Sequence, residues 1–395
     1  MLESINKPLL SIVIPTKNRQ YTCLHAIESA LLLAQNDIEI IVQDCSDTDV
    51  LKKQIIDKFG NNNVIKYEHV DTQPSMTDNW NRAFERAVGL FRCGIGDDDA
   101  VLPNIYKVAE WARKNNVDAI GHNRKYLYYW PDFAVWPDYT SKLLIQNPEI
   151  NENVKILERN ELDSLLIKQA TIPDMNYMKM PMVYHCLLSG VIIDTIIQKT
   201  GKFLDGTSLD VYSAFVLSLL VNKFCVFDTP FTLPGACGAS NTNKDAAKKD
   251  NGHFLDFGKI TVDKRIPDFY NLTFSIAEST QKAFSNMNDF SYSKLLDLPN
   301  LYADFLSKSF NIRMIKKLRQ LMRDNEFGIK DNMRFVGLFL IKIGNAAKFK
   351  CIISVKNVLF KFDFIKTLVT NRRDYTLYEH ENILQAVAYI QKKFL

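Results

Sequence analysis

The chain has 395 residues, of which 47% are hydrophobic, and this content supports a large buried core and more than one average domain. Its formal net charge is only +4, which argues against a general nucleic-acid-binding function, so we expect no nucleic-acid partner. None of the seven cysteines forms a C-x-x-C pair and several lie in apolar runs, which argues against a zinc site and favours a reducing, cytoplasmic environment.

The first third of the chain alternates between two apolar patterns. Short apolar runs typical of buried strands alternate with longer segments of helical periodicity, and this alternation predicts a mostly parallel sheet flanked by helices. Ligands bind such sheets beyond the carboxyl ends of the strands. We predict strands over residues 9–14, 38–43, 64–69, 90–95 and 117–121, and helices over residues 21–33, 50–59, 78–88 and 102–114.

Beyond residue 123 the pattern is less regular. Residues 123–176 mix Tyr, Trp and Pro without a clear period, whereas residues 208–221 predict a helix. Residues 230–243 contain two prolines and two glycines and read as a loop, and residues 244–252 read as a linker.

After this linker the chain becomes helical and basic. Residues 301–395 contain 18 Lys and Arg against 8 Asp and Glu, a net charge of +10. We therefore predict an α/β domain over residues 1–250 and a mainly helical, basic C-terminal region over residues 251–395. The charge asymmetry indicates an interaction surface in the second region.

Carboxylates follow two of the predicted strands. Asp97, Asp98 and Asp99 repel one another unless a cation is present, and Mg²⁺ or Mn²⁺ binds such oxygens together with substrate phosphates. The alternative is a solvated acidic turn that caps the helix beginning near Leu102. Asp44 ends the second strand, where it can accept hydrogen bonds from a base or a ribose, or else cap the helix that follows.

Four stretches together resemble family 2 glycosyltransferases, which have the Rossmann-like GT-A fold. They are SIVIPTKNR (11–19), IVQDCSD (41–47), SMTDNWNRA (75–83) and GDDDAVLP (96–103), and both their order and their spacing fit. The resemblance covers residues 8–125, weakens towards residue 245 and is absent beyond.

The resemblance implies a nucleotide-sugar donor, with a UDP-sugar favoured. The residues that would contact the nucleotide base are Pro15, Thr16, Arg19 and Asp44. Asp97 would contact the ribose. Asp98, five residues before Pro103, would bind Mn²⁺ or Mg²⁺, and Asp99 would assist. The sequence departs from the family at Gly96, where many members carry the first aspartate of D-x-D-D, and this leaves the individual roles within the triplet open.

The resemblance also implies an inverting transfer, which needs a general base to deprotonate the acceptor hydroxyl. Our first choice is Asp210, because its place before a helix is similar to the family's base-bearing segment; the alternative is a first-turn carboxylate favoured by the helix dipole. Asp205 is the second choice. His185 either faces the pocket or is a satisfied core residue, and we favour the core.

The aromatic residues between Tyr126 and Tyr139 also allow two interpretations. Trp130 and Trp136 could line an acceptor groove, because flat rings stack on sugar faces, or they could fill a core or a domain seam, which we slightly favour.

The C-terminal region combines basic residues with apolar residues at helical spacing over residues 312–323. Such a helix either lies on an anionic membrane surface or packs in a bundle with a solvated basic face. The longest apolar run, residues 335–341, is too short to span a bilayer. We therefore expect a cytoplasmic protein, with peripheral contact at the inner face of the plasma membrane as an open alternative.

The favoured function is a metal-dependent transferase that builds a surface polysaccharide such as O-antigen or capsule, with a glycan or lipid-linked acceptor. The processive members of the broader family carry membrane spans and a Gln-x-x-Arg-Trp motif, and neither occurs here, so we expect one sugar per encounter. The alternative is a non-catalytic nucleotide-sugar-binding or scaffold protein. A nucleotidyltransferase is discounted because residues 15–19 contain no glycine for a phosphate loop.

Overall fold

The computed structural model describes residues 7–123, 126–146, 154–240, 263–269, 271–308, 310–359 and 375–395. An eight-stranded sheet forms the centre of the first domain, in the order β3-β2-β1-β4-β10-β6-β11-β9. Only β9 and β10 run antiparallel to their neighbours, so the predicted mostly parallel α/β sheet is confirmed. The strands are β1 (Leu10–Thr16), β2 (Ile38–Asp44), β3 (Ile65–His69), β4 (Phe91–Gly94), β6 (Ala119–His122), β9 (Val154–Glu158), β10 (Leu187–Ser189) and β11 (Lys223–Phe227).

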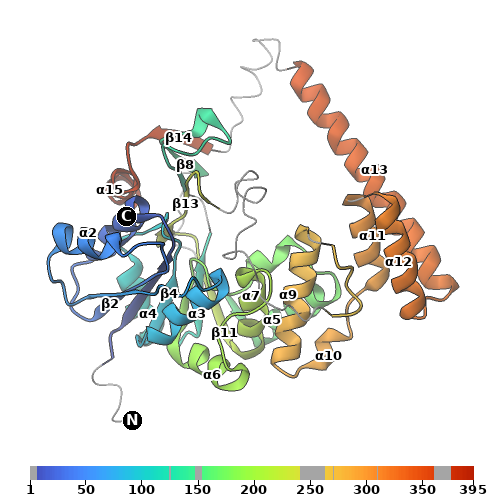
Figure 1. The fold of residues 1–395 in the computed structure, drawn as a ribbon, viewed down its shortest axis with the longest axis horizontal. Helices are drawn as coiled ribbons and strands as arrows, with labels where there is room; N and C mark the ends of the chain where they lie inside the picture. Colours follow the sequence, from blue (N-terminus) through green and yellow to red (C-terminus); the bar gives the residue numbers. More distant parts are fainter. Residues whose placement is uncertain are drawn as a thin grey trace.

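Helices cover both faces of this sheet because successive buried residues of each strand point to opposite sides (Figure 1). Along β1, Ile12 and Ile14 belong to one hydrophobic cluster and Val13 belongs to another. The first cluster includes side chains from α1 (Gln20–Leu31), α2 (Val50–Phe59) and α4 (Ile105–Lys114). The second includes side chains from α3 (Met76–Arg86), α5 (Arg159–Thr171), α6 (Gly190–Thr200) and α7 (Leu209–Leu220).

The predicted elements of residues 9–122 all occur, with boundaries that differ by a few residues. Helix α3 begins at Met76 rather than at residue 78 because Ser75 caps it, accepting a hydrogen bond from the backbone N–H of Asp78. Six cysteines are buried, as expected for small apolar side chains: Cys23, Cys45, Cys93, Cys186, Cys225 and Cys237.

A second sheet, which the sequence pattern did not predict, is built from three strands within residues 126–236 and from β14 near the C-terminus. Its order is β13-β7-β8-β14, and a two-stranded ladder lies beside it. The strands are β5 (Ala100–Val101), β7 (Tyr126–Tyr129), β8 (Lys142–Gln146), β12 (Thr232–Leu233), β13 (Gly235–Ala236) and β14 (Tyr375–Glu379), and two 3-10 turns are η2 (Pro137–Tyr139) and η3 (Met175–Lys179). Trp130 lies in the core of this part and is 1% exposed, whereas Trp136 is 54% exposed. The core interpretation therefore holds for Trp130.

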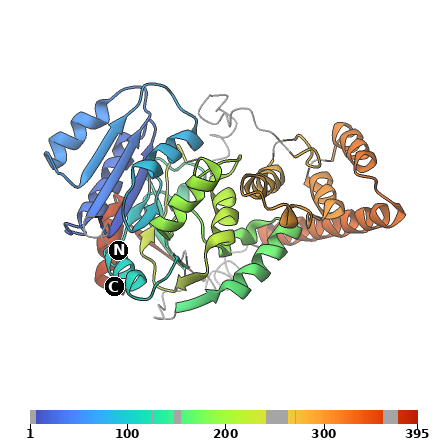
Figure 2. The same ribbon diagram turned by 90° about the horizontal axis from the view of Figure 1, so that it is seen from below.

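The C-terminal region is mainly helical, as predicted. Helix α9 packs on α7 of the first domain, and α11, α12 and α13 lie farther out, as Figures 1 and 2 show from two directions. The helices are α9 (Leu272–Asn286), α10 (Phe290–Ser293), α11 (Leu298–Lys308), α12 (Ile312–Asp324), α13 (Ile329–Leu359) and α15 (Ile383–Phe394). Among the described residues, no helix has the length and apolar character that a bilayer span requires.

The basic helix α12 packs its apolar side inside this bundle. Met314, Leu318 and Leu321 are buried in a cluster with residues of α9 and α11, and the basic residues between them are exposed. The bundle interpretation therefore accounts for the apolar spacing of α12. The predicted boundary near residue 250 stays a prediction, because residues 241–262 lie outside the described residues.

Residues 375–395 return to the first domain, although the division at residue 250 assigns them to the second. Strand β14 pairs antiparallel with β8, and α15 buries its apolar side chains against Ala100, Leu102 and Trp130. The phenol of Tyr128 also donates a hydrogen bond to the carbonyl of His380, at 2.9 Å. The small second sheet is thus completed by a strand from the C-terminal end of the chain.

We expect Ile390→Ala to lower the free energy of unfolding by about 2–5 kcal/mol, because this α15 side chain is fully buried and leaves a cavity when shortened. Urea unfolding followed by tryptophan fluorescence measures the change, since Trp130 belongs to the same cluster. The control is Gln391→Ala, an exposed position on the same helix. Equal transition midpoints for the two variants would show that α15 does not support the second sheet.

Candidate functional site

The carboxyl ends of β1, β2 and β4 meet at one edge of the large sheet. Strand β1 lies between the other two, with Thr16 beside Asp44 in the ladder to β2. A cavity of about 280 Å³ opens beyond this edge. Its lining residues come from the turn after β1, from α3, from the end of β4 and from the second half of the domain: Pro15, Thr16, Lys17, Arg19, Met76, Asn79, Trp80, Gly96, Asp97, Asp98, Asp99, Met182, Tyr184, His185, Asp210, Pro234, Gly235 and Ser240.

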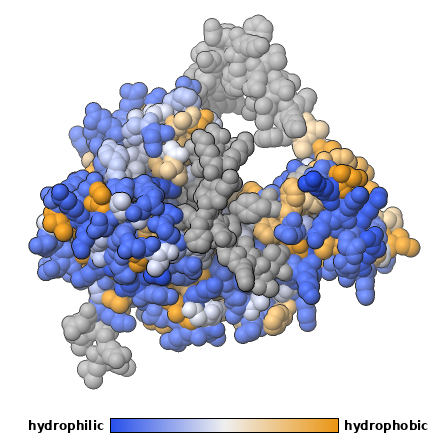
Figure 3. Space-filling view, viewed as in Figure 1, coloured by the Kyte–Doolittle hydropathy of each residue, from blue (hydrophilic) through white to orange (hydrophobic). Residues whose placement is uncertain are grey.

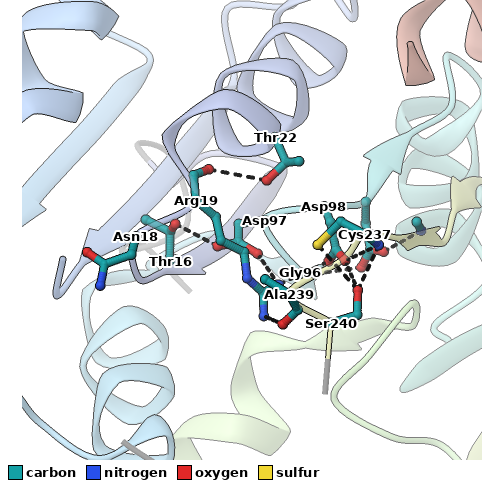
Figure 4. Close-up of polar contacts among 12 residues, drawn as sticks. Thr16, Asn18, Arg19, Thr22, Gly96, Asp97, Asp98, Cys237, Ala239 and Ser240 are labelled. Carbon is teal, nitrogen blue, oxygen red and sulfur yellow. Dashed lines mark hydrogen bonds and ion pairs between the residues drawn. The ribbon is translucent and has the colours of Figure 1, made fainter. Parts of the chain in front are cut away.

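Asp97 is held by the turn that follows β1 (Figure 4). The Thr16 hydroxyl donates to one carboxylate oxygen at 2.6 Å, and Arg19 Nη1 donates to the other at 2.9 Å. Burial raises the pKa of Asp97 to about 6, and the guanidinium of Arg19 acts in the opposite direction. Arg19 Nη2 also donates to the carbonyl of Ala239 at 2.7 Å, so Arg19 joins the strand edge to the segment that carries Ser240.

Asp98 is contacted by that same segment. Its Oδ2 accepts hydrogen bonds from the Ser240 hydroxyl at 2.5 Å and from the Cys237 backbone N–H at 3.4 Å. Its Oδ1 lies 3.6 Å from Arg19 Nη1. Since the cavity is lined by this carboxylate, Asp98 can present an oxygen to a cation that is also held by substrate phosphates, which is a ligand set that Mg²⁺ accepts. Within the described residues, no group of three or more His, Cys, Asp or Glu side chains is arranged to hold a metal by itself.

Asp99 has both oxygens engaged by backbone groups. Oδ1 accepts from the N–H of Gly235 at 2.7 Å, and Oδ2 accepts from the N–H of Gly96 at 2.6 Å. Burial and the neighbouring Asp98 raise the pKa of Asp99 well above its usual range, although the two N–H groups oppose this change. Asp99 therefore ties the strand end to the 234–240 segment, and its role as a metal ligand stays a prediction.

The two glycines that donate these hydrogen bonds, Gly96 and Gly235, both lie close to the aspartates. A Cβ on Gly96 would lie 2.9 Å from Asp98 Oδ1 and 3.0 Å from Asp99 Oδ2. A Cβ on Gly235 would lie 1.7 Å from the backbone oxygen of Asp98. At position 96 the neighbouring atoms are ends of side chains, whereas at position 235 the neighbouring atom belongs to the backbone and cannot move aside, so the requirement for glycine is strict at position 235.

Asp210 and Asp205 lie in different environments. Asp210 lines the cavity; the Tyr177 hydroxyl donates to its Oδ2 at 2.7 Å, and the Ser208 hydroxyl donates to its Oδ1 at 2.6 Å. Asp205 is not among the lining residues. It accepts hydrogen bonds from Asn286 of α9 and from its neighbour Gly206, and these bonds outweigh burial and lower its pKa.

Asp44 also lies outside the cavity lining. It is fully buried and accepts hydrogen bonds from the Ser46 N–H at 2.8 Å and from the Tyr67 hydroxyl at 2.9 Å. Asp44 lies beside Thr16 in the ladder between β1 and β2, so it packs behind a residue that lines the cavity.

His185 is both buried and part of the cavity lining. Its backbone has a φ of 60°, a region uncommon for a residue with a Cβ, and its N–H donates to the Gly94 carbonyl at the end of β4. Its Nε2 lies 3.4 Å from Asp99 Oδ2, and its Nδ1 lies 3.0 Å from the Thr232 hydroxyl. His185 is therefore both a buried residue with polar partners and a residue that lines the cavity, so the two interpretations do not exclude each other.

Several residues of the site were not predicted from the sequence: Gly235 and Ser240, which line the cavity, and Tyr177, which contacts a lining residue. Ser240 and Gly235 approach the triplet from more than a hundred residues away, and Tyr177 approaches Asp210 from a separate turn. No local pattern marks them, because each acts through a contact made only in the folded chain. Trp80 lies in the stretch SMTDNWNRA, one of the four that resemble the family, and it lines the cavity.

An α/β fold with a carboxylate-lined cavity at the carboxyl edge of its sheet is the arrangement of a GT-A glycosyltransferase fold, and three comparisons agree. Residues 11–162 match the model of glycosyl transferase family 2. A stretch of 100 residues is 38% identical to "Putative colanic acid biosynthesis glycosyl transferase WcaA" of Escherichia coli (strain K12). The match covers 25% of this chain and 36% of that protein, so the chain spans about a third of the curated relative's length.

The fold is also similar to that of TarS from S. aureus, solved in complex with UDP-GlcNAc. The TM-score is 0.51 at 13% identity, over 86% of this chain and 91% of that one. Residues 11–162 therefore match glycosyl transferase family 2, and the α/β part of the chain has a fold that matches GT-A glycosyltransferase structures.

Proposed function

We propose that this protein is an inverting, non-processive glycosyltransferase that moves a sugar from a nucleoside-diphosphate sugar to a glycan or lipid-linked acceptor in surface-polysaccharide biosynthesis. The observation that carries the proposal is that Asp97 and Asp98 from one half of the domain and Asp210 from the other half line the same cavity. The name of WcaA supports a polysaccharide product, and the UDP-GlcNAc complex of TarS supports a UDP-sugar as the donor.

The donor half of the cavity uses the residues at the ends of β1 and β4. Pro15, Thr16 and Arg19 would contact the nucleotide base, with Asp44 supporting them from β2, and Asp97 would accept hydrogen bonds from the ribose hydroxyls. Asp97 also holds Arg19 in place, at 2.9 Å. Arg19 is thereby oriented before a donor arrives, which reduces the entropy lost on binding.

Asp98, with Asp99 behind it, would hold Mn²⁺ or Mg²⁺ against the donor diphosphate. When bound, such a cation offsets the negative charge that develops on the leaving diphosphate. Ser240 and Cys237 fix the Asp98 carboxylate by hydrogen bonds to Oδ2.

Asp210 would take the proton of the acceptor hydroxyl, and Asp205 is the second candidate. Tyr177 and Ser208 orient the Asp210 carboxylate by the two hydrogen bonds that they donate to it. The engagement of Asp205 by Asn286 and Gly206 favours a structural role for that residue instead.

We expect the protein to release a nucleoside diphosphate from one member of a panel of nucleotide sugars in the presence of Mn²⁺. Asp98→Ala should abolish this release, because the carboxylate that would hold the cation is lost, and EDTA should do the same to the unchanged protein. Asp71→Ala, an exposed carboxylate after β3, is the matched control.

Full turnover in EDTA would contradict metal dependence. Nucleotide-sugar binding without release of nucleoside diphosphate or transfer, across the whole panel, would favour the alternative of a non-catalytic binding or scaffold protein.

We expect Asp210→Asn to lower the transfer rate about 10²–10⁴-fold, the usual contribution of general-base catalysis, with little change in donor affinity. Steady-state transfer rates and calorimetric donor titrations measure the two quantities separately. Asp205→Asn is the control, and it should retain most of the rate. The roles would be exchanged if Asp205→Asn lost the rate and Asp210→Asn kept it.

We also propose that the C-terminal region contacts the inner face of the plasma membrane peripherally. The support comes from α13, where apolar residues at spacings of three and four remain exposed: Ile329 at 82%, Met333 at 71%, Val336 at 50%, Leu340 at 62% and Ile343 at 40%. Figure 3 shows apolar side chains at the surface over this part of the molecule, on the right. Exposed basic residues of α12 and α13 provide the complementary charge for anionic lipids.

The protein should sediment with vesicles that contain anionic phosphatidylglycerol and stay in solution with neutral phosphatidylcholine vesicles. The double variant Met333→Glu/Leu340→Glu should lose most of this binding, because it puts two carboxylates on the apolar face. Val191→Glu, an equally exposed position on α6, is the control and should bind as the unchanged protein does. If the unchanged protein ignores anionic vesicles at low salt, the basic surface is merely solvated.

A further inference from the structure

A second, larger cavity lies beside the one that contains the aspartates. Its volume is about 710 Å³, within the range of small-molecule sites. The lining residues come from the far half of the large sheet, from α5 and from the segment 178–186: Gly121, His122, Asn123, Lys155, Leu157, Asn160, Glu161, Ser164, Leu165, Met178, Lys179, Met180, Met182, His185, Cys186, Phe224, Val226 and Asp228.

The floor of this second cavity is one face of three neighbouring strands. Alternate residues of β6, β11 and β9 point to the same side, and the ladder sets Gly121, Val226 and Lys155 in one row, with Phe224 and Leu157 in the next. Gly121 keeps the floor open, since a Cβ there would lie 3.0 Å from the Phe224 ring and 3.4 Å from the Cys186 sulfur.

The rim of the second cavity is polar but balanced in charge. It carries two lysines, Lys155 and Lys179, and two acids, Glu161 and Asp228, and the side-chain amide of Asn123 donates to the Asp228 carboxylate. The uncharged groups of Asn160 and Ser164 project from α5. An apolar floor with a neutral, hydrogen-bonding rim suits a ligand that has hydroxyl groups at one part and an apolar group at another.

The two cavities share a wall. Met182 and His185 line both of them. The turn η3 also contributes to both sides, because Tyr177 donates a hydrogen bond to Asp210 in the first cavity while Met178 and Lys179 line the second. The wall between the cavities therefore carries Met182 and His185, and the turn η3 connects the second cavity to Asp210 through Tyr177.

We propose that the second cavity binds the acceptor, and that this acceptor is a neutral glycoside bearing an apolar group. This inference rests on the proposed transferase function and names its second substrate class. The apolar group occupies the floor formed by Phe224, Leu157 and the methionines, and the sugar hydroxyls bond to the rim and reach past Met182 and His185 towards Asp210.

The ten methionines of the chain provide a direct test, because their methyl groups give separate signals when labelled with ¹³C. Met178 and Met180 line the second cavity, Met76 lines the first, and Met182 lines both. Single Met→Leu substitutions assign the signals. The probes are UDP with Mg²⁺, and n-octyl β-D-glucoside kept below the concentration at which it forms micelles.

We expect octyl glucoside to shift the signals of Met178, Met180 and Met182 saturably, and UDP to shift those of Met76 and Met182. The variant Ser164→Trp, which fills the cavity from α5, should lose the octyl glucoside shifts and keep the UDP shifts. Ile167→Trp is the matched control, because Ile167 is 48% exposed on the same helix and does not line the cavity. It should keep both sets of shifts.

Three results would overturn the inference while leaving the proposed function intact: unshifted Met178 and Met180 with octyl glucoside, equal shifts with octanol, or shifts that persist in Ser164→Trp. A shift of the exposed Met333 alone would mean that the glycoside merely adsorbs to α13. If UDP with Mg²⁺ leaves the signals of Met76 and Met182 unshifted in the unchanged protein, the proposed donor site is wrong. The assignment of the second cavity to the acceptor is then wrong as well.

Discussion

Three adjacent buried carboxylates at the end of β4 constrain the whole site, because like charges this close repel and each must be held by a donor. Asp97 receives donors from the turn after β1, Asp98 from Ser240 and Cys237, and Asp99 from backbone N–H groups. The 234–240 segment must therefore approach the triplet at main-chain distance, which only a glycine at position 235 permits. The chain itself supplies hydrogen-bond donors to all three carboxylates, and these donors offset the repulsion expected from the sequence.

A row of polar contacts connects the aspartate triplet to the second cavity. His185 lies against Asp99, and Thr232 lies between His185 and His122, at 3.0 Å and 2.6 Å from their ring nitrogens. The Thr232 hydroxyl can donate its one proton to only one of these ring nitrogens, so the other nitrogen must carry a proton and donate it to the hydroxyl oxygen. A group that binds near His122 in the larger cavity is thus connected to the triplet by three consecutive polar contacts.

Much of the fold could be predicted because its signals are local. The helix Val50–Phe59 has the predicted boundaries, since the apolar period that specifies it lies within its own ten residues. The small second sheet could not be predicted, because β13 is two residues long and β14 pairs with β8 across most of the chain. The candidate site likewise contains residues that local motifs mark and residues that only long-range contacts bring together. The triplet and Arg19 are marked by contiguous motifs, whereas the choice between Asp210 and Asp205 depends on which one α9 covers, and that contact has no signature in either segment.

The return of residues 375–395 to the first domain also has a consequence for the order of folding. Trp130 donates its indole N–H to the backbone oxygen of Asp98, and the buried side chains of α15 belong to the same hydrophobic cluster as this tryptophan. Tyr128 and His380, which fasten the returning segment, are 252 positions apart in the chain. Closing so long a loop is slow compared with forming the local strand–helix units. During synthesis the large sheet can assemble early. The packing around Trp130, which contacts the aspartate triplet, is completed only after residues 375–395 have emerged from the ribosome. The nascent protein therefore passes through a stage in which the sheet has formed but its binding edge lacks these contacts.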